Sequence, residues 1–237
     1  MDTQQLTTLV GGISGICWTI VYIALVYRSF RDKSYGMPIA ALAMNFAWEC
    51  TFSFIYPPES AGSMGMVLTI VNTVWALCDC GLVLAFFKNG YKYFEEVYGI
   101  SKKIFFSVSI LAFALSFMVM ITGGQFAMGI SDYFANDSFQ GAQLIALIQN
   151  AIMSVLFVTF FFTRKKAGHP VEGRSFYAAI AKLLGTSLSV GILYILLHPG
   201  VYFGASFILI SFIFDSWYCV LVYKELKVNG INPLKRI

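Results

Sequence analysis

The sequence predicts an all-α integral membrane protein, a bundle of seven transmembrane helices, and three observations lead to this fold class. Hydrophobic residues make up 58% of the 237 residues and charged residues 12%, whereas roughly a quarter of an average soluble domain is charged. Long apolar stretches recur along the whole chain. Nearly all basic residues fall in alternate connections between these stretches. The composition excludes a soluble globular enzyme, a disordered protein and a small disulfide-bonded scaffold.

Seven apolar stretches account for most of the chain, and each is long enough for a helix to cross a hydrocarbon core of roughly 30 Å. In chain order they are residues 7–27, 37–56, 64–87, 104–123, 142–163, 176–197 and 202–223. None alternates with a period of two residues, which excludes a transmembrane barrel. The first has no basic region before it and no small-residue cleavage site after it, so we expect a permanent helix. We expect residues 1–237 to form a single domain.

The basic residues indicate how the bundle is oriented. Fifteen of the sixteen Lys and Arg residues lie between the first and second spans, the third and fourth, the fifth and sixth, or after the seventh. The segments 57–63, 124–141 and 198–201 contain none. Because positive loops stay in the cytoplasm, we predict an N-terminus outside or in the lumen and a C-terminus in the cytosol. The longest outer connection, 124–141, is predicted to be a solvated connector, with a cap over the outer mouth as the alternative.

Ionisable side chains within the spans are the main indication of a functional site. They are Glu49, Asp79, Lys182 and Asp215. Each costs about 2.5–3.5 kcal/mol at mid-helix, so we expect them to be buried in the bundle and paired or used. Each belongs to a polar stripe at helical spacing: Asn45, Glu49 and Ser53; Asn72, Trp75 and Asp79; Lys182, Thr186 and Ser189; Ser211, Asp215 and Tyr218. A fifth stripe, without an ionisable residue, consists of Gln149, Asn150 and Ser154. Such stripes predict a polar chamber inside an apolar bundle. Trp48, Trp75, Trp217 and Tyr218 are close to the acids in sequence.

Pairing decides which buried acid can give up a proton. The rise of about 1.5 Å per residue places Asp79, Lys182 and Asp215 at one depth, with Glu49 nearer the outer side. Lys182 can pair with either aspartate, and we favour Asp79 as its partner. Glu49 has no cation at its own depth, so we expect it to be a neutral acid able to donate a proton. A neutral helix-packing residue bonded to Asn45 or Asn72 is the alternative interpretation of Glu49.

Metal, cofactor and nucleic-acid binding are not expected. All five cysteines lie in apolar runs, and Cys78 and Cys80 are two residues apart, on different faces of a helix. The only histidines are His169 and His198, so a Cys/His metal site is not expected. The sequence contains no phosphate-binding glycine motif, no HExxH and no aspartate-rich run for magnesium. The basic inner loops are explained by membrane topology.

Short motifs occur in an order that resembles a known family, the small seven-helix integral membrane terpene cyclases. The motifs are RDKSYGMP at 31–38, NFAWE at 45–49, NxxWxxxD at 72–79, QNAIMS at 149–154, GRS at 173–175, KxxGT at 182–186, and finally Asp215. Members of that family serve fungal meroterpenoid and indole-diterpene pathways, and bacterial relatives exist. The ordered set covers nearly the whole chain.

The resemblance implies an activity. Family members cyclise a polyprenyl chain attached to an aromatic, polyketide or indole head, and they begin by protonating a terminal epoxide or alkene. The reaction uses no metal, so the implied activity is a proton-initiated, metal-independent cyclase of the isomerase or lyase type, without a cofactor. The two essential acids of the family match Glu49 and Asp215. We predict Glu49 as the proton donor and Asp215 as a second acid or an orienting group.

The implied partner is a lipophilic prenylated small molecule that enters from the lipid bilayer. The expected supporting pocket consists of Asn45, Trp48, Asn72, Trp75, Asp79, Lys182 and Tyr218. In a fungal host the membrane would be the endoplasmic reticulum, and in a bacterial host the plasma membrane.

Two alternative functions use the same buried acids. A small proton-coupled transporter would relay protons through them, but the sequence shows neither the internal repeat nor the broken helices expected of it. A seven-helix receptor or retinal protein is the other alternative. A retinal protein needs a lysine in the middle of the last span, where this chain has Asp215.

Overall fold

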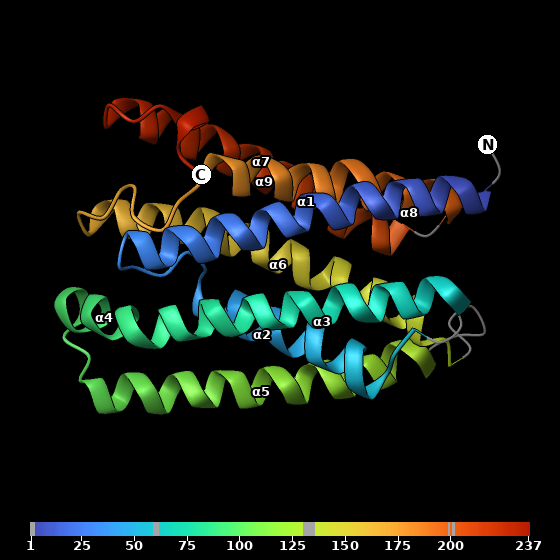
Figure 1. Ribbon diagram of the computed structural model, residues 1–237. Helices are drawn as coiled ribbons and strands as arrows, with labels where there is room; N and C mark the ends of the chain where they lie inside the picture. The colour runs from blue at the N-terminus through green and yellow to red at the C-terminus, as the bar shows by residue number, and fades with distance from the viewer. Residues whose placement is uncertain (1–2, 59–61, 130–135, 199, 201) are drawn as a thin grey trace. The chain divides into compact units, whose positions relative to one another are not determined.

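The computed structural model describes residues 3–58, 62–129, 136–198, 200 and 202–237, and these ranges contain helices and loops but no β-strand (Figure 1). The all-α prediction is confirmed. The elements are α1 (Thr3–Arg31), α2 (Ile39–Cys50), η1 (Thr51–Ile55), α3 (Gly62–Ala85), η3 (Phe86–Gly90), α4 (Tyr91–Tyr98), α5 (Lys102–Gly129), α6 (Ser138–Lys166), α7 (Phe176–Gly185), η4 (Thr186–Gly191), α8 (Ile192–Leu197), α9 (Tyr202–Val228) and η5 (Pro233–Lys235). The segments η1, η3 and η4 are π-helical.

Six described helices are long and apolar enough to cross a membrane: Gln5–Arg31, Gly65–Tyr98, Lys102–Gly129, Ser138–Lys166, Phe176–Leu197 and Tyr202–Val228. The remaining expected span, 37–56, is represented by the shorter apolar helix Ile39–Ile55. It is shorter because Pro38 stands immediately before its first residue and Pro57 follows soon after its last, and proline favours helix starts and stops.

Several helices are longer than their apolar spans. The third continues past residue 87 to Tyr98, so Lys88 and Lys92 lie on a helix and not in a loop. Gly99 ends this helix with a φ of 63°, and its N–H donates to the Glu95 carbonyl. An apolar window measures membrane thickness, whereas a helix ends where its backbone is capped.

The prediction of a solvated connector over 124–141 is wrong at both ends. Helix α5 runs to Gly129 and α6 begins at Ser138. The carboxylate of Asp137 accepts hydrogen bonds from the N–H groups of Phe139 at 2.9 Å and Gln140 at 3.3 Å, which caps the first turn of α6. Residues 130–135, which include Asp132, lie outside the described residues.

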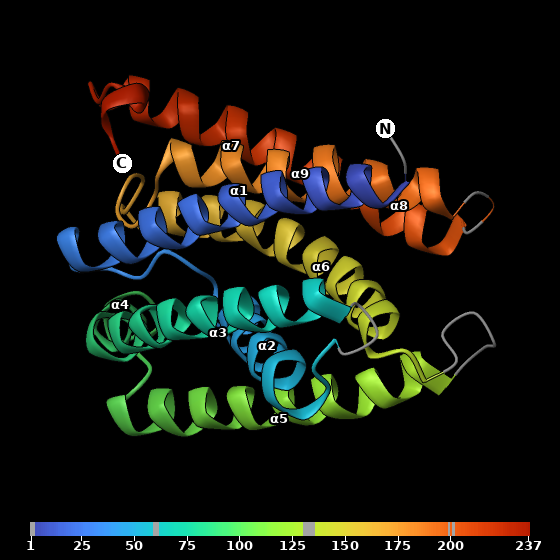
Figure 2. The ribbon, with the colours of Figure 1, turned by 45° about the vertical axis from the view of Figure 1, so that its right-hand side comes forward.

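The chain divides into two compact units, of which the first comprises Met1–Met37 and Asn150–Ile237. Within it α7 packs against both α1 and α9, and the three helices run side by side in both views (Figures 1 and 2). Glycine allows close approach: a Cβ at Gly185 would lie 2.7 Å from Cys17 Cβ, and Ser14 Oγ donates to the Gly185 carbonyl at 2.7 Å. Close backbone contact at small residues is typical of packed membrane helices.

Polar contacts tie together the loops at one end of this unit. Asp32 Oδ2 accepts hydrogen bonds from the Gly173 N–H at 2.9 Å and from Arg236 Nη2 at 2.8 Å. Arg236 also donates to the Val171 carbonyl at 2.9 Å. These contacts join the end of α1, the loop before α7 and the C-terminal segment.

Substitution of Gly173 by alanine is expected to destabilise this unit markedly. Gly173 has a φ of 70°, and a Cβ there would lie 2.8 Å from the Tyr35 carbonyl oxygen. Gly168 in the same loop has a φ of 85° but no atom within 4 Å of an added Cβ. Both changes impose a left-handed backbone on alanine, which costs about 1–2 kcal/mol, and only Gly173→Ala adds a steric cost of about 1–3 kcal/mol. Thermal unfolding of both variants in detergent measures the difference. Equal midpoints would show that the contact with Tyr35 is unimportant.

The second unit is Pro38–Gln149, in which α2 packs against both α3 and α5. Aromatic rings fill much of its interior. The Phe105 ring centroid lies 5.0 Å from that of Phe86 and 5.2 Å from that of Phe94, and the Phe46 ring lies 5.8 Å from that of Phe117. Helix α6 is shared, since its residues to Gln149 belong to this unit and those from Asn150 to the other.

Candidate functional site

The Pro38–Gln149 unit contains a hydrogen-bonded network of buried polar side chains. Asn45 Nδ2 donates to Asp79 Oδ2 at 2.8 Å, and Gln149 Nε2 donates to Asn45 Oδ1 at 3.0 Å. Glu49 lies one turn after Asn45 on α2. The exposed fraction is 3% for Glu49 and 0% for Asp79. The sequence pattern predicted Asn45, Glu49 and Asp79 as inward-facing, and all three are buried.

Asp79 has an unusual environment for a carboxyl group. Its Oδ2 accepts the Asn45 hydrogen bond, whereas its Oδ1 has no hydrogen-bond partner among the described residues. The ion pairs between described residues do not include Asp79. An isolated carboxylate away from water is so unfavourable that the group takes up a proton instead. Such surroundings favour the neutral carboxylic acid over the carboxylate at Asp79.

The other predicted pocket residues of this unit lie on the two helices that carry Asn45 and Asp79, α2 and α3. Asn72 is buried on α3, two turns before Asp79, and Trp75 is half-buried between them. The Trp48 Nε1–H donates to the Ala142 carbonyl at 3.3 Å, and the Trp48 ring lies 5.3 Å from that of Phe52. Trp48 is thus fixed by both its polar and its apolar parts.

The other unit contains a buried ion pair. Lys182 Nζ lies 2.7 Å from Asp215 Oδ1 and 2.8 Å from Asp215 Oδ2, and it also donates to Ser154 Oγ at 2.6 Å. The Lys182 side chain is 3% exposed and the Asp215 side chain 1%. The preference for Asp79 as the partner of Lys182 was wrong. The physical reason is helix packing: α7, which carries Lys182, packs directly on α9, which carries Asp215.

Aromatic neighbours of Asp215 point in different directions. Tyr218 is buried, and its ring lies 5.2 Å from that of Phe157. Trp217 is 45% exposed, so it does not line the interior of its unit. Helical spacing explains the difference, because Asp215 and Tyr218 are three residues apart and share a face, whereas Trp217 does not.

Two π-helical segments follow the buried charged residues closely, and sequence patterns did not reveal them. Segment η1 begins two residues after Glu49, and η4 begins four residues after Lys182. Their hydroxyl groups Thr51 Oγ1, Ser53 Oγ, Thr186 Oγ1 and Ser187 Oγ have no hydrogen-bond partner among the described residues. Single-turn π segments inside helices are frequent at functional sites.

Two arginines from the basic connection between the fifth and sixth predicted spans are buried. Arg164 is 2% exposed and Arg174 1%. The Arg164 guanidinium donates to Ser34 Oγ at 2.7 Å and lies over the Tyr35 ring. The Arg174 guanidinium lies over the Phe161 ring, and burial lowers the pKa of Arg174 to about 10. In the sequence, the GRS motif at 173–175 was the feature that could have marked Arg174 as more than a loop cation.

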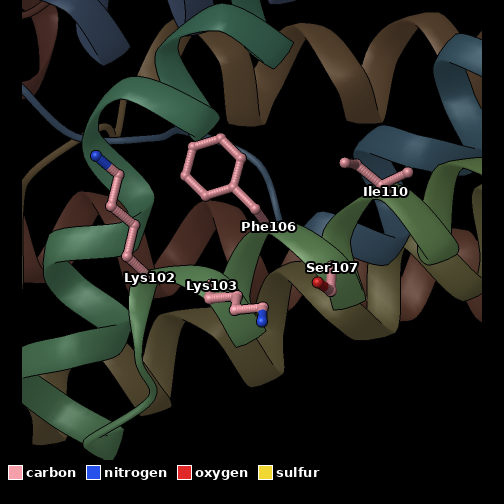
Figure 3. A pocket seen from close by; sticks show the side chains of 5 residues that line it. All are labelled: Lys102, Lys103, Phe106, Ser107 and Ile110. Carbon is pink, nitrogen blue, oxygen red and sulfur yellow. The ribbon is translucent and has the colours of Figure 1, made fainter.

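A surface hollow at the start of α5 is lined by Lys102, Lys103, Phe106, Ser107 and Ile110 (Figure 3). It contains no acid and none of the predicted site residues. Among the described residues, no three His, Cys, Asp or Glu side chains are grouped in a way that could hold a metal ion. The buried carboxyl groups are therefore the candidate site.

Fold and site together define a multi-pass helical membrane protein with buried, hydrogen-bonded acids in its apolar helices. The family of Pyr4-like transmembrane terpene cyclases matches residues 1–130, more than half of the chain, and the chain belongs to this family. The matched residues include Asn45, Glu49 and Asp79. Lys182 and Asp215 lie beyond them.

Individual relatives match over shorter segments. The chain is 35% identical over 77 residues to the terpene cyclase macJ of Penicillium terrestre, an alignment covering 32% of this chain and 28% of that protein. It is 38% identical over 77 residues to the Pyr4-family terpene cyclase mfmH of Annulohypoxylon moriforme, covering 32% and 29%. It is 42% identical over 55 residues to the terpene cyclase pyr4 of Aspergillus fumigatus, covering 23% of each. The alignments thus span less than a third of these relatives. No solved structure matches the chain.

Proposed function

We propose that the protein is a membrane-embedded terpene cyclase. It would cyclise a polyprenyl chain carried on an aromatic, polyketide or indole head, after protonation of a terminal epoxide or alkene. The observation that carries this proposal is that the segment matched by the cyclase family contains two buried carboxyl groups, Glu49 and Asp79. The names of the fungal relatives, all terpene cyclases, support the same activity.

A proton-initiated, metal-independent mechanism accounts for these acids. A carboxylic acid buried in an apolar setting keeps its proton at neutral pH and can donate it to the substrate, and the exclusion of water keeps the resulting cation from being quenched. Aromatic rings stabilise passing positive charge by about 2 kcal/mol or more when desolvated. The proton taken from the acid is returned when the last cation loses one, so substrate and product are isomers and no cofactor is consumed.

Glu49 and Asp215 are proposed as the catalytic residues, each within its own unit. Glu49 is a proton donor because it is buried in an apolar helix next to the Asn45 network. Asp215 is bound through both oxygens to the Lys182 ammonium group, which holds its carboxyl group in one orientation. The ion pair therefore supports the role of an orienting anionic group for Asp215, and not that of a proton donor.

The substrate and the membrane follow from the same reasoning. A lipophilic prenylated molecule would enter from the bilayer, which explains why the enzyme is embedded there. The alternation of basic loops supports an N-terminus in the lumen or outside and a C-terminus in the cytosol. In a fungal cell this membrane would be the endoplasmic reticulum, and in a bacterium the plasma membrane.

Membranes containing the protein are expected to convert at least one member of a panel of prenylated aromatics, polyketides and indoles into an isomer. Each substrate is offered with and without a terminal epoxide, in the presence of excess chelator. The product has unchanged mass and a shifted chromatographic retention, and membranes without the protein do not form it. Failure of well-folded protein on the whole panel would contradict the cyclase proposal. Loss of the product only when chelator is present would contradict metal independence.

A further inference from the structure

The environment of Asp79 has the features of an activated acid. Its two oxygens differ: Oδ2 accepts a hydrogen bond from Asn45 Nδ2 at 2.8 Å, and Oδ1 has no partner among the described residues. In a neutral carboxyl group the bonded oxygen is then the carbonyl oxygen, and the proton is on Oδ1. A hydroxyl without a local acceptor has nothing to compete with a substrate for its proton.

The amide chain behind Asp79 stabilises the charge that proton loss would leave. Gln149 donates to Asn45 at 3.0 Å, and Asn45 in turn donates to Asp79. Both Asn45 and Gln149 are 4% exposed. Successive hydrogen bonds polarise one another, and a hydrogen bond to a carboxylate is stronger than one to the neutral acid. The chain therefore favours the ionised product of the transfer more than the resting acid.

We propose that Asp79 is a second proton-donating acid of the cyclisation, with Asn45 and Gln149 as its positioning residues. The inference rests on the proposed function and deepens it. The single initiating proton leaves one of the two acids; when it leaves Asp79, the O–H bond at Oδ1 breaks and a bond forms from this hydrogen to the epoxide oxygen, to which Glu49 donates a hydrogen bond. The electron pair remains on the carboxylate. The proton lost by the last carbocation restores the acid.

Glu49 and Asp79 are compatible as acids of one reaction. An epoxide oxygen has two lone pairs, so it can accept from two acid hydroxyls while only one proton is transferred. Glu49 lies one turn from Asn45, the residue that contacts Asp79 directly. Turnover is then expected to depend on both acids.

The protonation state of Asp79 can be measured without any substrate. Infrared spectra of the full-length Glu49→Gln protein at neutral pH should retain the carbonyl band of a neutral carboxylic acid, because solvated acids are ionised there. The band should be missing from the Glu49→Gln/Asp79→Asn protein. A Glu49→Gln spectrum with no such band would overturn the inference.

The turnover rate of an Asp79→Asn variant tests whether the Asp79 proton is used in cyclisation. Asp79→Asn retains an oxygen that accepts from Asn45 but removes the acidic proton, so we expect a fall in turnover of about 100-fold or more with folding preserved. A merely structural acceptor role would leave turnover unchanged, and that result would overturn the inference. The matched control is Asp137→Asn in the same unit, where an amide oxygen can still cap α6 and full activity is expected.

The two proposals fail in different ways. A wild-type protein that cyclises no substrate contradicts the proposed function, whereas the infrared band is decided without substrate. An active wild type with an equally active Asp79→Asn variant contradicts the role of Asp79 alone. If Asp79→Asn does not fold, the band in the Glu49→Gln protein still decides whether Asp79 carries a proton.

Discussion

Glu49→Gln is expected to reduce cyclisation by about 100-fold or more while leaving the protein folded. Glutamine has nearly the shape of glutamic acid and can occupy the same buried site, where the wild-type side chain is only 3% exposed. It has no proton acidic enough to open an epoxide or to protonate an alkene. If Glu49 has the proposed role, a neutral amide replaces a neutral acid, so no buried charge is gained or lost and the unfolding midpoint should hardly change.

The measurement is the rate of isomer formation in membranes, normalised to the amount of folded protein. Glu96→Gln on α4 provides the matched control, since it makes the same substitution in the same unit at an exposed position. This control should retain the wild-type rate. A Glu49→Gln protein that also retains it would exclude Glu49 as a required acid. A Glu49→Gln protein that fails to fold would point instead to the helix-packing role.

Most of the fold could be predicted because hydrophobic length and loop charge are strong signals in a membrane protein. The six long helices and the shorter Ile39–Ile55 coincide with the seven apolar stretches. Helix ends were less predictable. The extension to Tyr98 depends on a capping glycine at Gly99, and the end of α5 at Gly129 lies beyond its apolar stretch. Neither is visible in a hydropathy window.

The buried positions of the site could also be predicted, whereas their pairing could not. Helical spacing identified Asn45, Glu49 and Asp79 as inward-facing, since period and polarity are both properties of the sequence. The rise per residue offered two aspartates, Asp79 and Asp215, as partners of Lys182. Depth does not say which helices are neighbours. Asp215 is the partner of Lys182 because α7 packs against α9.

Buried arginines show a related limit of charge patterns. Arg174 lies in a connection that the charge pattern assigns to the inner side, yet it is 1% exposed, with its guanidinium over the Phe161 ring. Loop position and burial are independent for a long side chain, because its guanidinium can fold back onto the helices. A count of basic residues therefore predicts an orientation in the membrane but does not locate the charges in space.

Lys182→Met is expected to destabilise the protein by about 3–5 kcal/mol, the largest effect on stability that the structure predicts. Its ammonium group is the cationic partner of Asp215, and it also donates to Ser154. Methionine fills a similar volume but leaves the Asp215 carboxyl group 1% exposed and without a counter-charge. Replacing both charges, as in Lys182→Met/Asp215→Leu, should restore most of the lost stability, because a well-packed apolar pair can substitute for a buried ion pair.

Unfolding free energies in detergent, measured as a double-mutant cycle, separate the pair energy from packing changes. Lys165→Met is the matched control, because Lys165 also forms an ion pair, with Glu225 at 2.5 Å, but its side chain is 51% exposed. The Glu225 side chain is 9% exposed, but half of the Lys165 side chain is in solvent, so we expect a smaller loss of stability than for Lys182→Met. Equal losses for the two single variants would show that the Lys182–Asp215 pair does not behave as a buried one. Restored stability in the double variant together with lost turnover would separate the contribution of Asp215 to folding from its proposed contribution to the reaction.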